Sequence, residues 1–273
     1  MANRAVADHD DWLLGGASVI GAAHERRGVP NQDAIRWVPA GGPAKRVIIA
    51  LSDGHGGAAH FRSDIGAKLA TDAAVTVLDW FFDADDFAEA ADALPGELVA
   101  CWREMVAAHA AEQPFGADDM LLPYGATCVA AAIAEDRMVL CQLGDGDLLV
   151  GLPDGRITRP FPTEQLPGEQ TYSLCLPNAE DHARVMLFRR DAREGWPDFV
   201  MLSTDGVAKS FPDAETFEGV VRRYRELGRT DLKATLDGLP EWLADVTRRG
   251  SGDDVSLCLA VRGAGRQQET RDA

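Results

Sequence analysis

The chain has 273 residues and a formal net charge of −17, with 44 Asp and Glu residues against 27 Lys and Arg residues. This charge argues against nucleic acid as the main partner, because phosphate backbones bind to basic surfaces. An acidic enzyme can still bind phosphate if metal ions supply the positive charge. Residues 1–12 lack the apolar core of a signal peptide, and no later stretch approaches the ~18 apolar residues of a membrane span. We therefore expect a cytoplasmic protein that does not contact a membrane.

The cysteines show no C-x-x-C spacing, and four of them have apolar neighbours. We interpret them as reduced packing residues and not as zinc ligands. They are Cys101, Cys128, Cys141, Cys175 and Cys258.

The N-terminal half begins with strands and continues into helices. Apolar runs predict strands at 12–21, 34–39 and 47–51. A loop over 22–33 joins the first two strands. Apolar residues recur at helical spacing from 58 to 82, which predicts a long amphipathic helix packed on the sheet. A second helical stretch, 88–111, is interrupted near Pro95, a residue typical of the first turn of a new helix.

The C-terminal half consists mostly of short predicted strands, and two predicted helices precede the last of these strands. Strands are expected at 126–134, 138–143, 148–152, 156–159, 184–188, 199–202 and 255–261. Pro153-Asp154-Gly155 predicts a hairpin turn. Helical spacing returns at about 214–227 and 232–248.

Runs of strands beside runs of helices, without strict alternation, predict an α+β sandwich. No compositional break divides the chain, so we expect one domain over 12–262, between a polar arm (1–11) and a disordered tail (263–273). The segment 160–183 is rich in Pro, Gly and Glu and is long for a loop, which is typical of a functional flap.

Acidic residues stand directly at the edges of the predicted strands. The strand at 47–51 runs into Ser52-Asp53-Gly54-His55-Gly56-Gly57, and further acids at strand edges are Asp33, Asp145, Asp205, Asp253 and Asp254. Because clustered carboxylates repel one another, they persist at neutral pH only if cations neutralise them. Oxygen ligands select hard ions such as Mg²⁺ or Mn²⁺, and a pair of such ions can activate water against a phosphoryl group. A single Asp-Gly pair is also an ordinary turn signal, as we interpret Asp154-Gly155, but the joint pattern indicates a hydrolytic site.

The motifs resemble, in order and spacing, the metal-dependent serine/threonine protein phosphatases of type 2C. They are Gln32-Asp33-Ala34, Ser52-Asp53-Gly54-His55-Gly56-Gly57, Gly125-Ala126-Thr127, Leu143-Gly144-Asp145-Gly146, Leu202-Ser203-Thr204-Asp205-Gly206 and Gly252-Asp253-Asp254-Val255-Ser256. His24 with Gly28-x-Pro30-Asn31-Gln32-Asp33, together with Gly144-Asp145-Gly146, is similar to the divergent bacterial branch of that family. The resemblance implies an αββα sandwich of two mostly antiparallel sheets flanked by helices.

The resemblance also implies roles for individual residues around two Mn²⁺ or Mg²⁺ ions. Asp53 would bridge both ions, the Gly54 carbonyl and Asp33 would serve the second ion, and Asp205 and Asp253 the first. Asp145, with Asp205, could hold a third ion. Asp254 would support the ligands from outside the coordination sphere. His55 would protonate the departing serine or threonine oxygen, for which an ordinary histidine pKa is suited.

Two positions depart from the family pattern. Gln32 is neutral where the family commonly has Glu, which removes one negative charge from the second ion site. Gly28 stands where many members have the arginine that binds the substrate phosphate. Arg27 or Arg62 could replace it, because a guanidinium can bind phosphate oxygens from several directions.

We therefore expect a protein phosphatase that removes phosphate from serine or threonine by direct attack of water, with a phosphoprotein, such as a serine/threonine kinase or its target, as partner. The cysteines lack the Cys-x5-Arg pattern of tyrosine phosphatases. One alternative is a pseudophosphatase, a binding module for a phosphoprotein or kinase with little turnover, which Gln32 and Gly28 favour. Another is a hydrolase that acts on a small phosphorylated metabolite.

Overall fold

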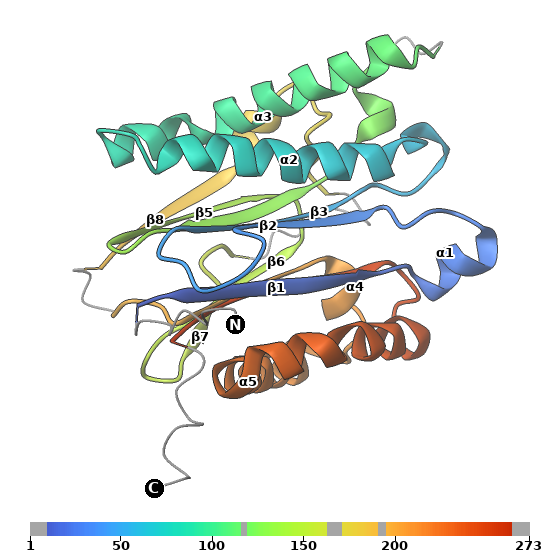
Figure 1. Cartoon of the computed structure of the whole chain (residues 1–273). Coiled ribbons are helices and arrows are strands. Elements are labelled where there is room, and N and C mark those ends of the chain that lie inside the picture. The colour runs from blue at the N-terminus through green and yellow to red at the C-terminus, as the bar shows by residue number, and fades with distance from the viewer. Residues whose placement is uncertain (1–9, 116–118, 163–170, 191–194, 264–273) are drawn as a thin grey trace, which may run out of the picture.

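The computed structural model describes residues 10–115, 119–162, 171–190 and 195–263, which fold into four layers (Figure 1). The helices α2 (Ser63–Phe81) and α3 (Phe87–Glu112) cover one sheet, and α5 (Ala214–Arg249) covers the other. Two five-stranded sheets lie between these helical layers. The predicted α+β fold, an αββα sandwich, is confirmed.

All strand pairs in both sheets are antiparallel. The sheet beneath α2 has the order β2 (Asp33–Val38), β3 (Val47–Asp53), β4 (Cys128–Ile133), β5 (Arg137–Leu143) and β8 (Arg184–Arg189). The sheet against α5 has the order β1 (Trp12–Val19), β10 (Val255–Arg262), β9 (Phe199–Ser203), β6 (Asp147–Gly151) and β7 (Ile157–Thr158).

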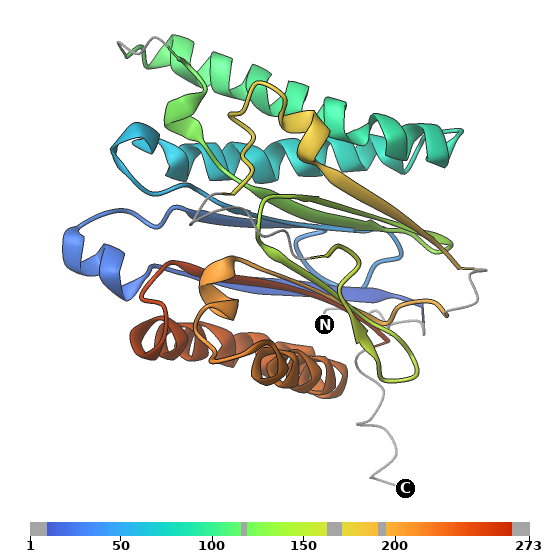
Figure 2. The ribbon, with the colours of Figure 1, turned by 180° about the vertical axis from the view of Figure 1, so that it is seen from behind.

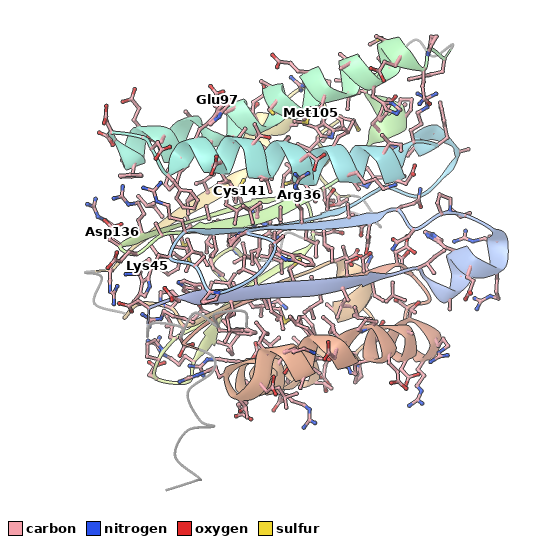
Figure 3. All side chains as sticks on the ribbon, viewed as in Figure 1. Arg36, Lys45, Glu97, Met105, Asp136 and Cys141 are labelled. Atoms are coloured by element: carbon pink, nitrogen blue, oxygen red, sulfur yellow. The ribbon has the colours of Figure 1, made fainter. Side chains whose placement is uncertain are left out.

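The central strands are buried on both faces. All residues of β4 and β9, and all of β3 before Asp53, are buried. Helices cover one face of each sheet and the opposite sheet covers the other, so these strands read as continuous apolar runs without alternation. Met105 of α3 and Cys141 of β5, labelled in Figure 3, both belong to the apolar layer between the helices and the first sheet. All five cysteines are unpaired and four are buried, as predicted.

Three helical predictions need correction. The predicted loop 22–33 contains the helix α1 (Ala22–Arg27), which ends at Gly28 with the positive φ of 67° typical of a helix C-terminus. The helix predicted from residue 58 begins only at Ser63, after the 3-10 turn η1 (Ala58–His60). The helix α3 runs through Pro95 without a break, because buried side chains such as Leu94, Leu98 and Trp102 continue the packed face on both sides of the proline.

The two predicted C-terminal helices are present, joined at a kink at Asp231, whose φ of −154° and ψ of 91° are not helical. The short helices α4 (Asp205–Ala208), η2 (Leu122–Tyr124) and η3 (Ala179–His182) were not predicted. No helix of the described residues is long and apolar enough to cross a membrane.

Most of the predicted arm and tail, residues 1–9 and 264–273, and part of the predicted flap, 163–170, lie outside the described residues. The described end of the flap contains η3, which packs against α3 before β8 begins (Figure 2).

Candidate functional site

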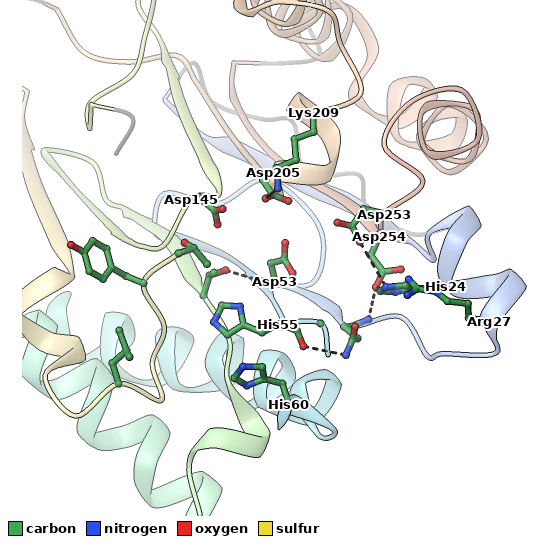
Figure 4. A pocket seen from close by; sticks show the side chains of 17 residues that line it. His24, Arg27, Asp53, His55, His60, Asp145, Asp205, Lys209, Asp253 and Asp254 are labelled. Atoms are coloured by element: carbon green, nitrogen blue, oxygen red, sulfur yellow. Dashed lines mark hydrogen bonds and ion pairs between the residues drawn. The ribbon is translucent and has the colours of Figure 1, made fainter. Parts of the chain in front are cut away.

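A pocket of about 740 Å³ opens where the acid-bearing ends of the strands meet. Its lining includes Asp53, Asp145, Asp205 and Asp253, which Figure 4 shows directed towards a common space. These acids come from four separate segments: the end of β3, the turn between β5 and β6, the start of α4 after β9, and the turn before β10. Carboxylates far apart in the sequence are thus brought together by the antiparallel sheets.

Asp53 and Gly54 are held by tight backbone contacts. The Asp53 N–H donates to the Thr127 Oγ1 at 3.0 Å, and the Gly54 N–H donates to the Gln32 carbonyl at 3.0 Å. A Cβ on Gly54 would lie 2.6 Å from the Ser63 carbonyl oxygen and 2.7 Å from that of Gln32. Only glycine fits at this position, because a side chain would displace the backbone on both sides.

The carboxylates of the pocket raise one another's pKa. Desolvation, and then the charges of Asp33, Asp205, Asp253 and Asp145, raise the pKa of Asp53 well above its ordinary value. Burial and the Asp205 charge raise the pKa of Asp145 to about 6. In the absence of cations, the pocket therefore disfavours the fully ionised form of this cluster.

Asp33 is not in the lining of this pocket. It pairs with Asp53 in the register of β2 and β3, and it is buried, with 5% of its surface exposed. Its Oδ2 accepts hydrogen bonds from Thr204 Oγ1 (2.9 Å) and Ser256 Oγ (2.7 Å), whereas Oδ1 is buried without a partner. A buried carboxylate oxygen without a donor is costly, and a cation or a water would satisfy it.

His55 lies in the lining beside His60, with ring centroids 5.1 Å apart. Its backbone N–H donates to the Gly125 carbonyl at 3.0 Å, which fixes the turn after Asp53. Burial, and then the neighbouring His60, lower the pKa of His55 to about 4, although Asp205 acts in the opposite direction. Without bound ions the imidazole is therefore neutral at pH 7.

Two cationic side chains belong to the lining. Lys209, one helical turn after Asp205, forms an ion pair with the Asp205 carboxylate. Burial lowers the pKa of Lys209, but the ion pair with Asp205 and the charges of Asp145 and Asp253 outweigh it and raise the pKa. Arg27 lines the pocket from α1, with its Nε donating to the Ala23 carbonyl at 3.1 Å. Lys209 was not predicted as a site residue, although the spacing Asp-x-x-x-Lys at the start of a helix could have indicated it.

Arg62 is directed elsewhere. Its Nη1 donates to the Gln113 carbonyl at 3.0 Å and to the Tyr124 hydroxyl at 2.8 Å, and its guanidinium lies 4.4 Å from the centroid of the Phe115 ring. It is not among the residues that line the pocket. Of the two arginines predicted as phosphate ligands, Arg27 therefore lines the pocket and Arg62 does not.

Further polar groups complete the pocket. Thr171 and Tyr172, from the described end of the predicted flap, lie in its lining. Gln32 also lines it, but its side-chain amide donates to Ser63 Oγ at 2.5 Å. Asp254 is in the lining too, but it is almost fully buried and accepts hydrogen bonds from the Gly21 and Gln32 N–H groups.

The donor set fits divalent cations, although its side chains stand apart from one another. Within the described ranges, no three His, Cys, Asp or Glu side chains are close enough to form a ready-made metal site. The five lining carboxylates and the partnerless oxygen of Asp33 nevertheless offer the kind of oxygen donors that Mg²⁺ and Mn²⁺ prefer. The raised pKa values of Asp53 and Asp145 show that a divalent cation beside them would be favourable, because it would stabilise their ionised forms.

The structure is similar to several solved bacterial phosphatases. The catalytic domain of the serine/threonine phosphatase PstP, solved with two manganese ions, is 17% identical, with a TM-score of 0.60 over 92% of this chain and 98% of that one. PppA, a type VI secretion regulator of Pseudomonas aeruginosa, is 18% identical, with a TM-score of 0.62 over 92% of this chain and 97% of that one. Stp1 of Staphylococcus aureus is 17% identical, with a TM-score of 0.58 over 96% of this chain and 99% of that one.

At these identities the similarity concerns the fold. A sequence comparison with curated proteins gave no match. The family model for protein phosphatase 2C, however, matches residues 20–245, which include most of the pocket. The chain belongs to the protein phosphatase 2C family of hydrolases.

Proposed function

We propose that this protein is a Mn²⁺- or Mg²⁺-dependent phosphatase that hydrolyses phosphoserine and phosphothreonine in other proteins. The observation that carries the proposal is the set of five carboxylates, from four separate segments, that line one pocket. Only two cationic side chains of the described residues share this lining, Arg27 and Lys209. The excess of negative charge would repel a phosphate unless divalent ions neutralised it.

The residues that would hold the ions follow from their places. Asp53 is surrounded by the other acids and would bridge two ions, with the Gly54 carbonyl beside it. Asp205 and Asp253 would complete the site of one ion. Asp33 would support the second ion through its Oδ1, which has no hydrogen-bond partner. Asp145, with Asp205, would hold a third ion. Ions bound there would supply the charge that binds phosphate and would lower the pKa of the attacking water.

The described lining holds no cysteine, so a cysteinyl-phosphate route is not offered there, and attack by water is the route that metal ions held by its aspartates would support. Arg27, in the lining, would bind a phosphate oxygen, in the role that Gly28 cannot fill. The physiological substrate would be a phosphoprotein, such as a serine/threonine kinase or its target, whose phosphorylated loop reaches the open pocket.

His55 would give a proton to the departing alcohol. For this the negative charge of the bound phosphoester must raise the pKa of the imidazole from about 4, because it stabilises the protonated ring. A serine or threonine oxygen is a poor leaving group and needs this proton, whereas p-nitrophenolate leaves without it. His55→Gln should therefore reduce turnover of a phosphothreonine peptide by about 10²-fold or more and that of p-nitrophenyl phosphate far less. Equal losses on the two substrates would contradict the role of His55 as proton donor.

The proposal is tested by manganese-dependent release of phosphate from a phosphothreonine peptide. Turnover should require Mn²⁺, should stop with a chelator, and should be abolished in Asp53→Asn and Asp205→Asn. The matched control is Asp154→Asn, which changes an acid in the exposed hairpin between β6 and β7, where Asp154 pairs with Arg156. Unchanged turnover in either pocket variant would refute the proposed site, and binding of a phosphopeptide without turnover would favour a pseudophosphatase.

A further inference from the structure

The first observation concerns His24, a histidine of α1 that lines the pocket and yet is buried, with 8% of its surface exposed. Its Nδ1 lies 2.9 Å from Asp254 Oδ2, and its Nε2 lies 3.9 Å from Asp253 Oδ1 (Figure 4). One ring nitrogen is therefore bonded to a buried acid, and the other faces an acid of the pocket.

The hydrogen bonds of Asp254 fix the orientation of the His24 ring. Its Oδ1 accepts the Gly21 N–H at 2.5 Å, and its Oδ2 accepts the Gln32 N–H at 2.7 Å as well as the His24 contact. Since its other partners are both N–H donors, Asp254 acts as an acceptor, and the proton of the contact with His24 belongs to Nδ1. The lone pair of a neutral His24 ring is then on Nε2, on the side of Asp253.

The backbone around α1 fixes this orientation further. The Ala23 N–H donates to the Gly252 carbonyl at 2.8 Å, and the Ala22 N–H donates to Thr247 Oγ1 at 3.0 Å. A Cβ on Gly21 would lie 2.6 Å from the backbone nitrogen of Asp254, so α1 can approach the Asp253-Asp254 turn this closely only with glycine there.

The contact between His24 and Asp254 is of the kind that metal-bound histidines make with a supporting carboxylate. Such histidines give their second ring N–H to a carboxylate, which fixes the tautomer and orients the free nitrogen towards the ion. With ligand bonds of about 2.1 Å, adjacent ligands of one ion lie ~3 Å apart and opposite ligands ~4.2 Å apart. The separation of 3.9 Å between Nε2 and Asp253 Oδ1 lies between these two values, so one ion could contact both atoms after a small movement of the half-exposed Asp253 side chain.

We propose that His24 Nε2 is a ligand of the ion that Asp253 binds, which gives this centre a nitrogen donor among its oxygens. The inference rests on the proposed metal-dependent function. An imidazole ligand favours Mn²⁺ and other transition ions over Mg²⁺, which takes oxygen ligands. The competing interpretation is a structural histidine that only links α1 to Asp254 and never touches an ion.

Pulsed electron paramagnetic resonance on the Mn²⁺-loaded full chain distinguishes these interpretations. The wild-type protein should show coupling of Mn²⁺ to a directly bound nitrogen-14, and incorporation of nitrogen-15 histidine should replace it with the nitrogen-15 signal. In His24→Gln the histidine coupling should disappear, and Mn²⁺ affinity measured by calorimetry should fall about tenfold or more while Mg²⁺ affinity changes less. His60→Gln, which alters another histidine of the lining, should keep the coupling.

Mn²⁺ binding without histidine coupling in the wild-type protein would overturn the role of His24 and leave the proposed function standing. Coupling that persists in His24→Gln would assign the nitrogen to another histidine and overturn the inference as well. If the wild-type protein bound no Mn²⁺ at all, both the inference and the proposed function would fail. The isotope experiment needs no variant, so it decides the matter even if His24→Gln does not fold.

Discussion

The substitution Asp53→Asn should stabilise the metal-free protein while removing its response to Mn²⁺. Desolvation and the charges of Asp33, Asp205, Asp253 and Asp145 raise the pKa of Asp53. Folding raises the pKa of such an acid, so at a pH where it is ionised in both the folded and the unfolded chain it destabilises the folded state. The cost is about 1.4 kcal/mol for each pKa unit of the shift. The neutral asparagine removes this cost.

The pH dependence of this effect has a defined sign. Below the unfolded-state pKa, near the ordinary value of 3.8, both states are protonated and Asp53 contributes nothing. As the pH rises from there through the raised pKa, the metal-free wild-type protein loses stability relative to Asp53→Asn. The advantage of the variant should therefore vanish near pH 4 and be largest above neutrality.

Bound Mn²⁺ should reverse the order of the two proteins. At a free concentration one hundred times the dissociation constant, an ion stabilises the folded state by about 2.7 kcal/mol. For a chain of this size that corresponds to a rise in Tm of about 5–10 °C. The wild-type protein should show this rise, and Asp53→Asn should show little of it.

Thermal unfolding followed by circular dichroism, with chelator and with a Mn²⁺ series from pH 4 to pH 8, measures both effects. Asp154→Asn, in the exposed hairpin, should behave as the wild-type protein in every condition. The reasoning would be refuted if metal-free Asp53→Asn were less stable than the wild-type protein at pH 8, or if both responded equally to Mn²⁺.

Further substitutions test other parts of the structure. Gly66→Ala places a Cβ against the Tyr124 carbonyl oxygen and should destabilise the fold by about 3 kcal/mol or more, seen as a lower urea midpoint. Arg225→Met removes a guanidinium that binds Asp198 through two hydrogen bonds of 2.8 Å and should cost about 3–5 kcal/mol by the same measurement, because a buried carboxylate loses its main partner. Lys209→Met should increase Mn²⁺ affinity about two- to fivefold by calorimetry, because it removes a competing cation from an ion pair of moderate strength; an unchanged affinity would contradict that competition.

Much of the fold follows from local patterns in the sequence. The apolar runs of β3 and β9 stop at Asp53 and just before Asp205, so both the strands and their acidic ends can be predicted from period and composition. The break predicted at Pro95 was wrong. Proline lacks the backbone N–H of a helical hydrogen bond, but the packing of the buried face of α3 outweighs that loss. The helix α1 could not be predicted, because its six residues are mostly polar or small and show no helical spacing of apolar side chains.

The candidate site was predictable as a set of residues but not as a geometry. The sequence could place Asp33 and Asp53 at strand ends, but only the structure shows that the two pair across β2 and β3 while Asp33 stays outside the pocket lining. No local pattern separates Arg62, which binds the Tyr124 hydroxyl, from Arg27, which lines the pocket. Such distinctions depend on contacts between distant segments.

The central claim is that the carboxylates of this pocket form one catalytic metal centre, and parallel measurement of bound Mn²⁺ and turnover tests it most directly. Equilibrium dialysis of the metal-stripped protein should show two Mn²⁺ ions bound per chain, with hydrolysis of a phosphothreonine peptide rising as they bind. Asp205→Asn should lose both binding of the full complement and turnover. Turnover by the metal-stripped protein in the presence of a chelator, or full Mn²⁺ binding and activity in Asp205→Asn, would contradict the account.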